Sequence, residues 1–281
     1  MTDQITWKAM PPPSADDDGP TPADATVPES EGFLATWRRL SLGLWLAPVG
    51  IAALIAVLYA YYQSLDLENA VRQTGSALRW DTKLWPQLVQ HVQISFWATV
   101  IVIAIAVPLG IVLTRPAFRR VGPYIVAVAN SGQALPAYGL LVLVAAGLGM
   151  NARAAVWAFV VYALLPVLRN TMVGLDNVDR AVIEAGRGMG MTRLQVLTRI
   201  ELPLAVPVIL AGVRVAMVLN IGMATLAFLI GGGALGVTIY SGIELNQNSV
   251  LIVGAVLVAI VALTFDWLGA VAERYLRPRG V

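Results

Sequence analysis

The sequence predicts an all-helical protein that crosses a lipid bilayer about six times. Of its 281 residues, 58% are hydrophobic and 13% are charged, whereas soluble domains run near 45 to 50% apolar and about 25% charged. The apolar residues gather in several runs close to the roughly 20 residues that a helix needs to cross a bilayer core. The few charges lie mostly between these runs, as in a polytopic membrane protein.

Composition also excludes several classes of function. The chain contains no cysteine and one histidine, so it offers no disulfide or thiolate metal site and little from which to build a catalytic cluster. It carries no G-x-x-x-x-G-K-[ST] motif, so we expect no P-loop ATP site in this chain. We therefore expect a non-catalytic protein without a cofactor or metal of its own. Membrane lipid, and no nucleic acid, is expected among its partners.

Residues 1–35 are predicted to form a disordered acidic cytoplasmic tail. They hold six prolines, seven acidic residues and one lysine, a composition that buries too little surface to offset its ordering entropy. An inert solvating tail and a partner-binding segment are both open. Residues 36–90 are predicted to add an N-terminal transmembrane helix, at about 41–62, and a polar extracytoplasmic connector. The apolar run exceeds the roughly 7 to 15 residues of a secretory signal core, which favours a retained span.

Five further spans are predicted at about residues 94–113, 121–150, 154–168, 202–230 and 250–271. The span at 121–150 carries Asn130, Gln133 and Pro136 in its middle, which predicts a kink or local unwinding. His91 precedes the span at 94–113 and is expected at the outer membrane interface. The stretch 231–236 matches a dinucleotide-binding pattern, but no βαβ unit surrounds it. We interpret this stretch as an irregular extracytoplasmic turn.

The basic residues orient the spans. Six spans place both termini and the connectors 114–120 and 169–201 on one side, which holds thirteen basic residues after residue 35, against four on the other side. The positive-inside rule makes the first side, with both termini, cytoplasmic. Arg214 and Asp266 lie within spans, where a charge costs at least about 2.5 to 3.5 kcal/mol near the helix centre. Either they pair with each other or each reaches the cytoplasmic interface.

The connector 170–201 is long and prone to form helices. It contains a short helix, a turn permitted by glycines at 188–190, and a second helix that is expected to place Leu194, Leu197 and Ile200 on one face. A short helix on the cytoplasmic surface suits the groove of another protein. The alternative is an amphipathic connector that rests on lipid.

This connector resembles the EAA signature of ATP-binding-cassette (ABC) importer permeases. The residues concerned are Glu184, Ala185, Gly186 (where alanine is usual), Gly188, Gly190, Ile200, Leu202 and Pro203. The resemblance extends over 162–171, 183–192, 201–209, 221–226 and 231–236, and there it is closest to permeases for glycine betaine, choline and related osmoprotectants. It implies the type I importer transmembrane fold, with a permease core at 91–275 and a basic tail at 276–281.

The resemblance also implies partners and a mechanism. The connector would dock on a cytoplasmic ABC ATPase, which would hold ATP and Mg. A second permease subunit, identical or related, and an extracytoplasmic solute-binding protein would complete an importer in the cytoplasmic (inner) membrane. A permease for another small solute, such as an amino acid, is the alternative, and an ion-coupled secondary transporter is less favoured.

Four residues in and beside the kinked span are candidates for lining the translocation path: Asn130, Gln133, Pro136 and Tyr138. A broken helix exposes carbonyl groups that a polar solute can use, and an aromatic face attracts a quaternary ammonium group. The alternative is that the polar pair Asn130 and Gln133 bonds neighbouring helices.

Overall fold

The computed structural model describes residues 29–65 and 72–276, with side chains for 44–65 and 75–276. The chain divides into two compact units, Met1–Gly43 and Leu44–Val281. One helix leads into the second unit. That helix begins at Glu29, so its first residues belong to the stretch predicted as a tail, while residues 1–28 lie outside the described residues.

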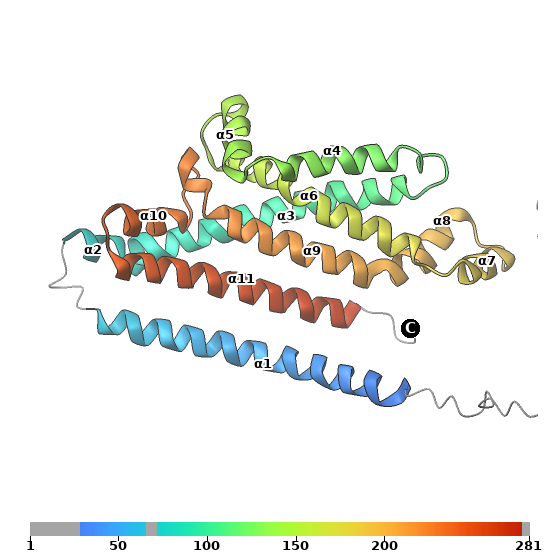
Figure 1. Cartoon of the computed structure of the whole chain (residues 1–281), viewed down its shortest axis with the longest axis horizontal. Coiled ribbons are helices and arrows are strands. Elements are labelled where there is room, and N and C mark those ends of the chain that lie inside the picture. Colours follow the sequence, from blue (N-terminus) through green and yellow to red (C-terminus); the bar gives the residue numbers. More distant parts are fainter. Residues whose placement is uncertain (1–28, 66–71, 277–281) are drawn as a thin grey trace, which may run out of the picture. The chain divides into compact units, whose positions relative to one another are not determined.

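The described residues form helices joined by short turns, with no β-strand among them (Figure 1). In chain order the elements are α1 (Glu29–Ser64), α2 (Arg72–Ala77), the π-helical turn η2 (Trp80–Leu84), α3 (Trp85–Leu113), α4 (Gly122–Ala134), α5 (Ala137–Leu148), α6 (Ala152–Asp176), α7 (Arg180–Gly188), α8 (Arg193–Val196), the π-helical turn η3 (Leu197–Glu201), α9 (Leu202–Ala224), the 3-10 turn η4 (Ala227–Ile230), α10 (Gly236–Glu244) and α11 (Asn248–Leu276).

Five helical stretches of the described chain are long and apolar enough to cross a membrane: Leu44–Ser64, Trp80–Leu113, Ala152–Asp176, Arg193–Ala224 and Asn248–Leu276. The helix pair α4 and α5 also passes this test jointly, but it is bent by 100°. The pair makes either a broken sixth span or a re-entrant loop. The prediction of about six spans is therefore met if the broken pair is counted as one.

The predicted break in the third span is confirmed, and its cause is local. Leu135 has extended backbone angles (φ −71°, ψ 140°) between α4 and α5, because the ring of a following proline disfavours the helical region for the residue before it. Pro136 then caps the start of α5. Figure 1 shows α5 turned away from the direction of α4.

Several predicted boundaries were wrong by five residues or more: α9 ends at Ala224 instead of about 230, and α11 ends at Leu276 instead of about 271. Two other helices are also longer than expected. The helix predicted to end at residue 168 continues to Asp176. It can do so because the side chains of Asn170 and Thr171 donate hydrogen bonds to carbonyl oxygens of the preceding turn. The helix predicted to begin at residue 94 begins at Trp85. Its polar first turns are accommodated because Gln87 and Gln90 bond the segment around α10.

Helix α6 lies at the centre of the core and packs against α3, α4, α5 and α9. Its buried residues Ala155, Ala158, Phe159 and Ala163 are fully covered. The neighbouring helices approach α6 through small residues, the usual way in which helices pack in a bilayer. A side chain on Gly110 of α3 would place its Cβ 2.7 Å from Thr171 Cγ2, so the close crossing of α3 and α6 requires glycine there.

His91 was predicted to lie at the membrane interface, and this prediction was wrong. Its side chain is fully buried between α3 and α9, with Nε2 3.0 Å from the carbonyl oxygen of Ile221. Ser95 and Thr99 continue the same face of α3 at four-residue intervals and donate to the carbonyls of His91 and Ser95. The Asn220 side chain of α9 lies at the end of this row and contacts the Thr99 hydroxyl at 2.9 Å. A buried polar seam therefore joins α3 to α9.

Candidate functional site

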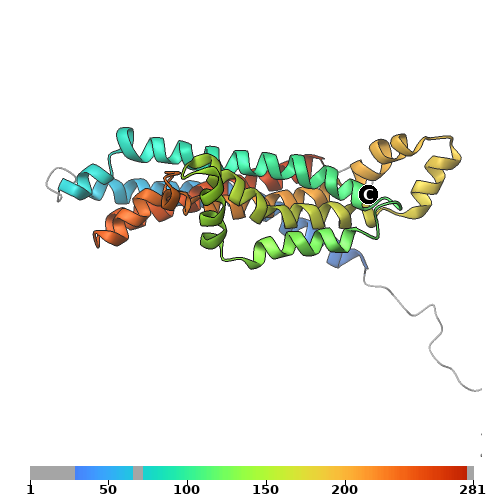
Figure 2. The ribbon, with the colours of Figure 1, turned by 90° about the horizontal axis from the view of Figure 1, so that it is seen from above.

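The connector between α6 and α9 projects beyond the ends of both helices as α7, a tight turn and α8 (Figures 1 and 2). Helix α7 begins at Asp179, whose carboxylate accepts a 2.8 Å hydrogen bond from the backbone N–H of Ala181. Such a cap satisfies one of the unpaired N–H groups of a helix start. Within α7 only Gly186 is buried, while Glu184 and Ala185 are exposed. The helix thus rests on the protein by a narrow face and presents most of its surface outward.

The turn after α7 depends on Gly190, which has a left-handed backbone (φ +84°). Its N–H donates to Arg187 O at 2.9 Å. The chain then enters α8 through a capping box in which Thr192 and Gln195 each bond the other's backbone N–H. The predicted helix, glycine turn and second helix are confirmed.

The prediction that Leu194, Leu197 and Ile200 share one face of the second helix was partly wrong. Leu194 is 68% exposed, whereas Val196 is 1% exposed. Helix α8 is only four residues long and passes into the π-helical turn η3 before α9. An inserted π-helical turn rotates the following side chains relative to a regular helix, so a strict helical spacing does not describe this face.

Gly186 allows the connector to fold back closely on itself. A Cβ built on Gly186 would lie 2.5 Å from Ile200 Cδ1 and 3.4 Å from Met191 Sδ. The side chain of Ile200, from η3, therefore packs directly on the backbone of α7. Ile200 thus uses the space that glycine, in place of the usual alanine, leaves at this position.

An ion pair between Arg115 and Glu201 fastens the connector to the rest of the protein. Arg115 Nη2 lies 2.6 Å from Glu201 Oε2, and the Glu201 side chain is only 6% exposed. Arg115 also donates to Ile111 O at the end of α3, so the pair joins α3 to the start of α9. Both residues line a polar cleft of about 350 Å³ beside α7. Sequence reasoning missed this pair, since its members are 86 residues apart.

We expect Arg115→Ala to destabilise the protein by about 2 to 4 kcal/mol, because it leaves the buried Glu201 carboxylate without its partner. The lower part of that range is favoured because Arg115 is 34% exposed. Thermal unfolding of the purified protein measures the loss, and Glu201→Gln in the same chain should recover part of it. Arg119→Ala is the matched control, since Arg119 and Asp176 are 3.6 Å apart and both exposed. Equal effects of Arg115→Ala and Arg119→Ala would contradict the assignment.

The two charges predicted within spans form a contact. Arg214 Nη2 lies 2.8 and 2.9 Å from the two carboxylate oxygens of Asp266, and Nε lies 3.0 Å from Oδ1. Of the two predicted alternatives, the pair is the one observed. Glu273, which the sequence reasoning left out, adds a third member 3.3 Å from Arg214 Nη1. Gly269 lies between the two acids on α11 and leaves room for the Arg214 stem.

The four candidate path residues gather around the bend between α4 and α5, but they do not face one way. Gln133 Nε2 donates to Tyr162 O at 2.9 Å and so ties α4 to α6. The Asn130 side chain is exposed and makes no hydrogen bond among the described residues. Tyr138 is 55% exposed, and Pro136 forms the bend.

The glycine-rich stretch is an irregular turn between η4 and α10, as predicted in shape. Gly231, Gly233 and Ala234 have positive φ angles of 72°, 73° and 70°. The turn is held by Gln90 of α3, whose side-chain oxygen accepts from Ala234 N at 3.2 Å. It lies toward the end of the bundle opposite α7 and α8 (Figures 1 and 2).

A bundle of apolar spans with a helix, a glycine turn and a helix projecting between two of them defines a polytopic transport permease. The sequence profile of the family described as "Binding-protein-dependent transport system inner membrane component" matches residues 106–278. The chain belongs to this family and is an inner-membrane permease subunit of an ABC importer. Helix α1 precedes the matched residues.

Individual relatives and solved structures agree with this membership. The chain is 42% identical over 192 residues to the choline transport system permease protein OpuBB of Bacillus subtilis (strain 168), covering 68% of this chain and 88% of the relative. It is 40% identical over 192 residues to the osmoprotectant import permease protein OsmY of Salmonella typhimurium, covering 68% and 81%. Inward-facing structures of the MetNI methionine ABC transporter match with TM-scores of 0.61 and 0.62 at 23% and 22% identity, covering 69% of this chain and 96% of theirs. The predicted type I importer fold is confirmed.

Proposed function

We propose that this subunit imports small osmoprotectants that carry a quaternary ammonium group, such as glycine betaine and choline. The observation that carries the proposal is the identity of about 40% to relatives named as choline, glycine betaine, carnitine and osmoprotectant permeases. An extracytoplasmic binding protein delivers the solute, and ATP hydrolysis by a separate ATPase drives its passage. The chain itself breaks no bond, and ATP and Mg are bound by the ATPase.

The projecting connector is proposed as the surface on which the ATPase acts. Glu184 and Ala185 lie on the exposed side of α7, where a partner's groove can reach them. Gly186 and Ile200 form the inner contact that holds α7 against η3. Gly188 ends α7 and Gly190 makes the turn, while Leu202 and Pro203 begin α9. Movement of α7 would thus pass directly into α9, a membrane span. In this proposal both termini are cytoplasmic.

The exposed side of α4 and α5 is proposed to face a second permease subunit, identical or related, across the translocation path. A polar side chain that faces lipid is expensive, so the exposed Asn130 amide is expected to meet protein or water instead. Tyr138 offers an aromatic face that attracts a quaternary ammonium group. Gln133 and Pro136 are proposed to fix the bend at the edge of this path.

The proposal is tested by uptake into proteoliposomes that contain the permease with its partner ATPase and binding protein. We expect ATP-dependent uptake of labelled glycine betaine or choline, and no uptake of methionine. Uptake of an amino acid instead would refute the proposed solute while keeping the importer. Uptake driven by an ion gradient in liposomes that contain the permease alone would refute the importer mechanism.

A further inference from the structure

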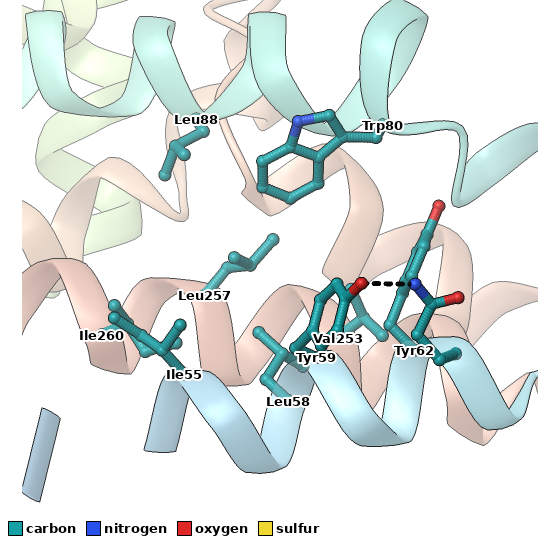
Figure 3. A pocket seen from close by; sticks show the side chains of 10 residues that line it. Ile55, Leu58, Tyr59, Tyr62, Trp80, Leu88, Val253, Leu257 and Ile260 are labelled. Carbon is teal, nitrogen blue, oxygen red and sulfur yellow. Dashed lines mark hydrogen bonds between the residues drawn. The ribbon is translucent and has the colours of Figure 1, made fainter. Parts of the chain in front are cut away.

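An apolar cavity of about 490 Å³ separates α1 from the face formed by α3 and α11 (Figure 3). Ile55, Leu58 and Tyr59 of α1 form one wall. Val253, Leu257 and Ile260 of α11 also line the cavity, and Trp80 and Leu88 lie across from the labelled α1 residues in Figure 3. All these residues belong to the unit Leu44–Val281.

The cavity exists because α1 is fastened at its two ends and stands away from the core between them. At one end Tyr62 Oη donates to Leu78 O at 2.8 Å, and its neighbours pack on an apolar cluster that includes Leu84 and Val250. At the other end Trp267 Nε1 donates to Leu44 O at 3.0 Å. No residue of Leu44–Ser64 is buried by the protein. Ile51, Leu54 and Leu58 in its middle are only half-buried, so this chain covers the middle of α1 incompletely.

Water cannot fill this space, because a water molecule needs two to four polar partners and the cavity walls are apolar along nearly their whole length. An empty cavity of this size would forfeit the dispersion contacts of every wall atom. The walls belong to segments that span the membrane, so hydrocarbon of the bilayer is the medium that reaches them.

We propose that one acyl chain of a membrane phospholipid occupies this cavity and completes the packing of α1 on the core. The volume falls in the range of about 300 to 1,000 Å³ that encloses ligands of such size. The polar groups lie at the end near Ser64, where Gln63 Nε2 donates to Tyr59 Oη at 2.8 Å and the Trp80 ring is 46% exposed. Aromatic and amide groups of this kind suit the headgroup level.

Charge near the same end suits a phosphate headgroup. Arg79 and Lys83 lie near Trp80 in the chain with Asp81 between them, and all three are exposed. The segment 79–83 therefore carries two basic residues against one acidic residue, and its basic groups can pair with a phosphate. Because bilayer and cavity are equally apolar, retention of the lipid rests on the close fit of its chain and on this headgroup contact rather than on removal from water.

The test compares two tryptophan substitutions on α1. Ile55→Trp places a larger ring in the cavity, whereas Val57→Trp places it on a position that is 65% exposed and outside the cavity. The purified full-length proteins are exchanged extensively into detergent, and bound phospholipid is counted by native mass spectrometry. We expect about one retained phospholipid per chain for the unchanged protein and for Val57→Trp, and at least tenfold less for Ile55→Trp. Equal retention in all three proteins, or none in the unchanged protein, would overturn the proposal.

A photo-crosslinking amino acid at Leu88 gives a second measurement that does not depend on the folding of Ile55→Trp. After detergent exchange, we expect Leu88 to crosslink to phospholipid and the same group at Trp97, which is 57% exposed on α3, to have lost its lipid. A crosslink from Leu88 to a second copy of the chain, or to detergent alone, would show a different occupant and refute the assignment.

Discussion

Gly190→Pro is expected to abolish uptake while the permease still inserts into the membrane. Gly190 has φ +84°, and its N–H donates to Arg187 O at 2.9 Å. Proline fixes φ near −65° and has no N–H, so it can provide neither the backbone angle nor the hydrogen bond. The turn must open, and α7 loses its fixed position relative to η3 and α9. Uptake in proteoliposomes and co-purification of the ATPase measure the effect, and the amount of permease in the membrane serves as reference.

Two further substitutions at the same position separate backbone angle from side-chain size. No atom lies within 4 Å of a Cβ built on Gly190, so bulk is not excluded by this chain. Asparagine tolerates the left-handed region better than most residues, whereas a β-branched residue there is strained. Gly190→Asn should therefore keep much of the ATPase binding that Gly190→Val loses, although the two side chains are similar in size. Equal loss in both would show that the partner, and not the turn, excludes a side chain. Normal uptake by Gly190→Pro would refute the coupling role of the connector.

The parts of this site that the sequence predicted are those set by neighbouring residues. The glycine turn and the break before Pro136 each follow from backbone preferences that act within a few residues. The membrane spans follow from composition over about 20 residues. These features need no knowledge of what packs against them, and the structure contains them all.

The parts that sequence reasoning missed depend on contacts between distant segments. Arg115 was counted only as a basic residue on the cytoplasmic side, because nothing near it in the chain indicates that Glu201 lies 2.6 Å away. Leu194 was expected on one face with Leu197 and Ile200, because the π-helical turn η3 that follows it does not show in apolar spacing. His91 offered one usable signal: Ser95 and Thr99 follow it at four-residue intervals on the same face of α3, a spacing that indicates a polar stripe.

Asp266→Ala is expected to lower the amount of correctly assembled permease. The size of the loss depends on the contacts that Arg214 keeps. An unpaired charge at the centre of a span costs about 2.5 to 3.5 kcal/mol. Arg214 and Asp266 are partly exposed, and Arg214 keeps Glu273 at 3.3 Å, so we expect a smaller loss of about 1 to 2 kcal/mol. Asp266→Ala combined with Glu273→Ala should exceed either single change, because Arg214 then has no acidic partner among the described residues. Thermal unfolding in detergent measures each step. Arg274→Ala, at an exposed neighbour of Glu273 on the same helix, is the control and should have little effect.

Exchange of the charges of Arg214 and Asp266 gives a sharper test of their contact. The stability expected of the exchanged protein depends on Glu273. In the double variant Arg214→Asp with Asp266→Arg, position 214 on α9 carries a carboxylate in place of the guanidinium group that contacts Glu273. This carboxylate and that of Glu273 have like charges and repel each other. Stability should therefore recover only in part, and further when Glu273→Gln removes the repulsion. If the recovery of stability does not depend on Glu273, then Glu273 does not interact with the pair Arg214 and Asp266. A normal unfolding temperature for Asp266→Ala would show that the pair between α9 and α11 contributes nothing to the fold, because a bidentate arginine contact of 2.8 to 3.0 Å would then be lost without effect.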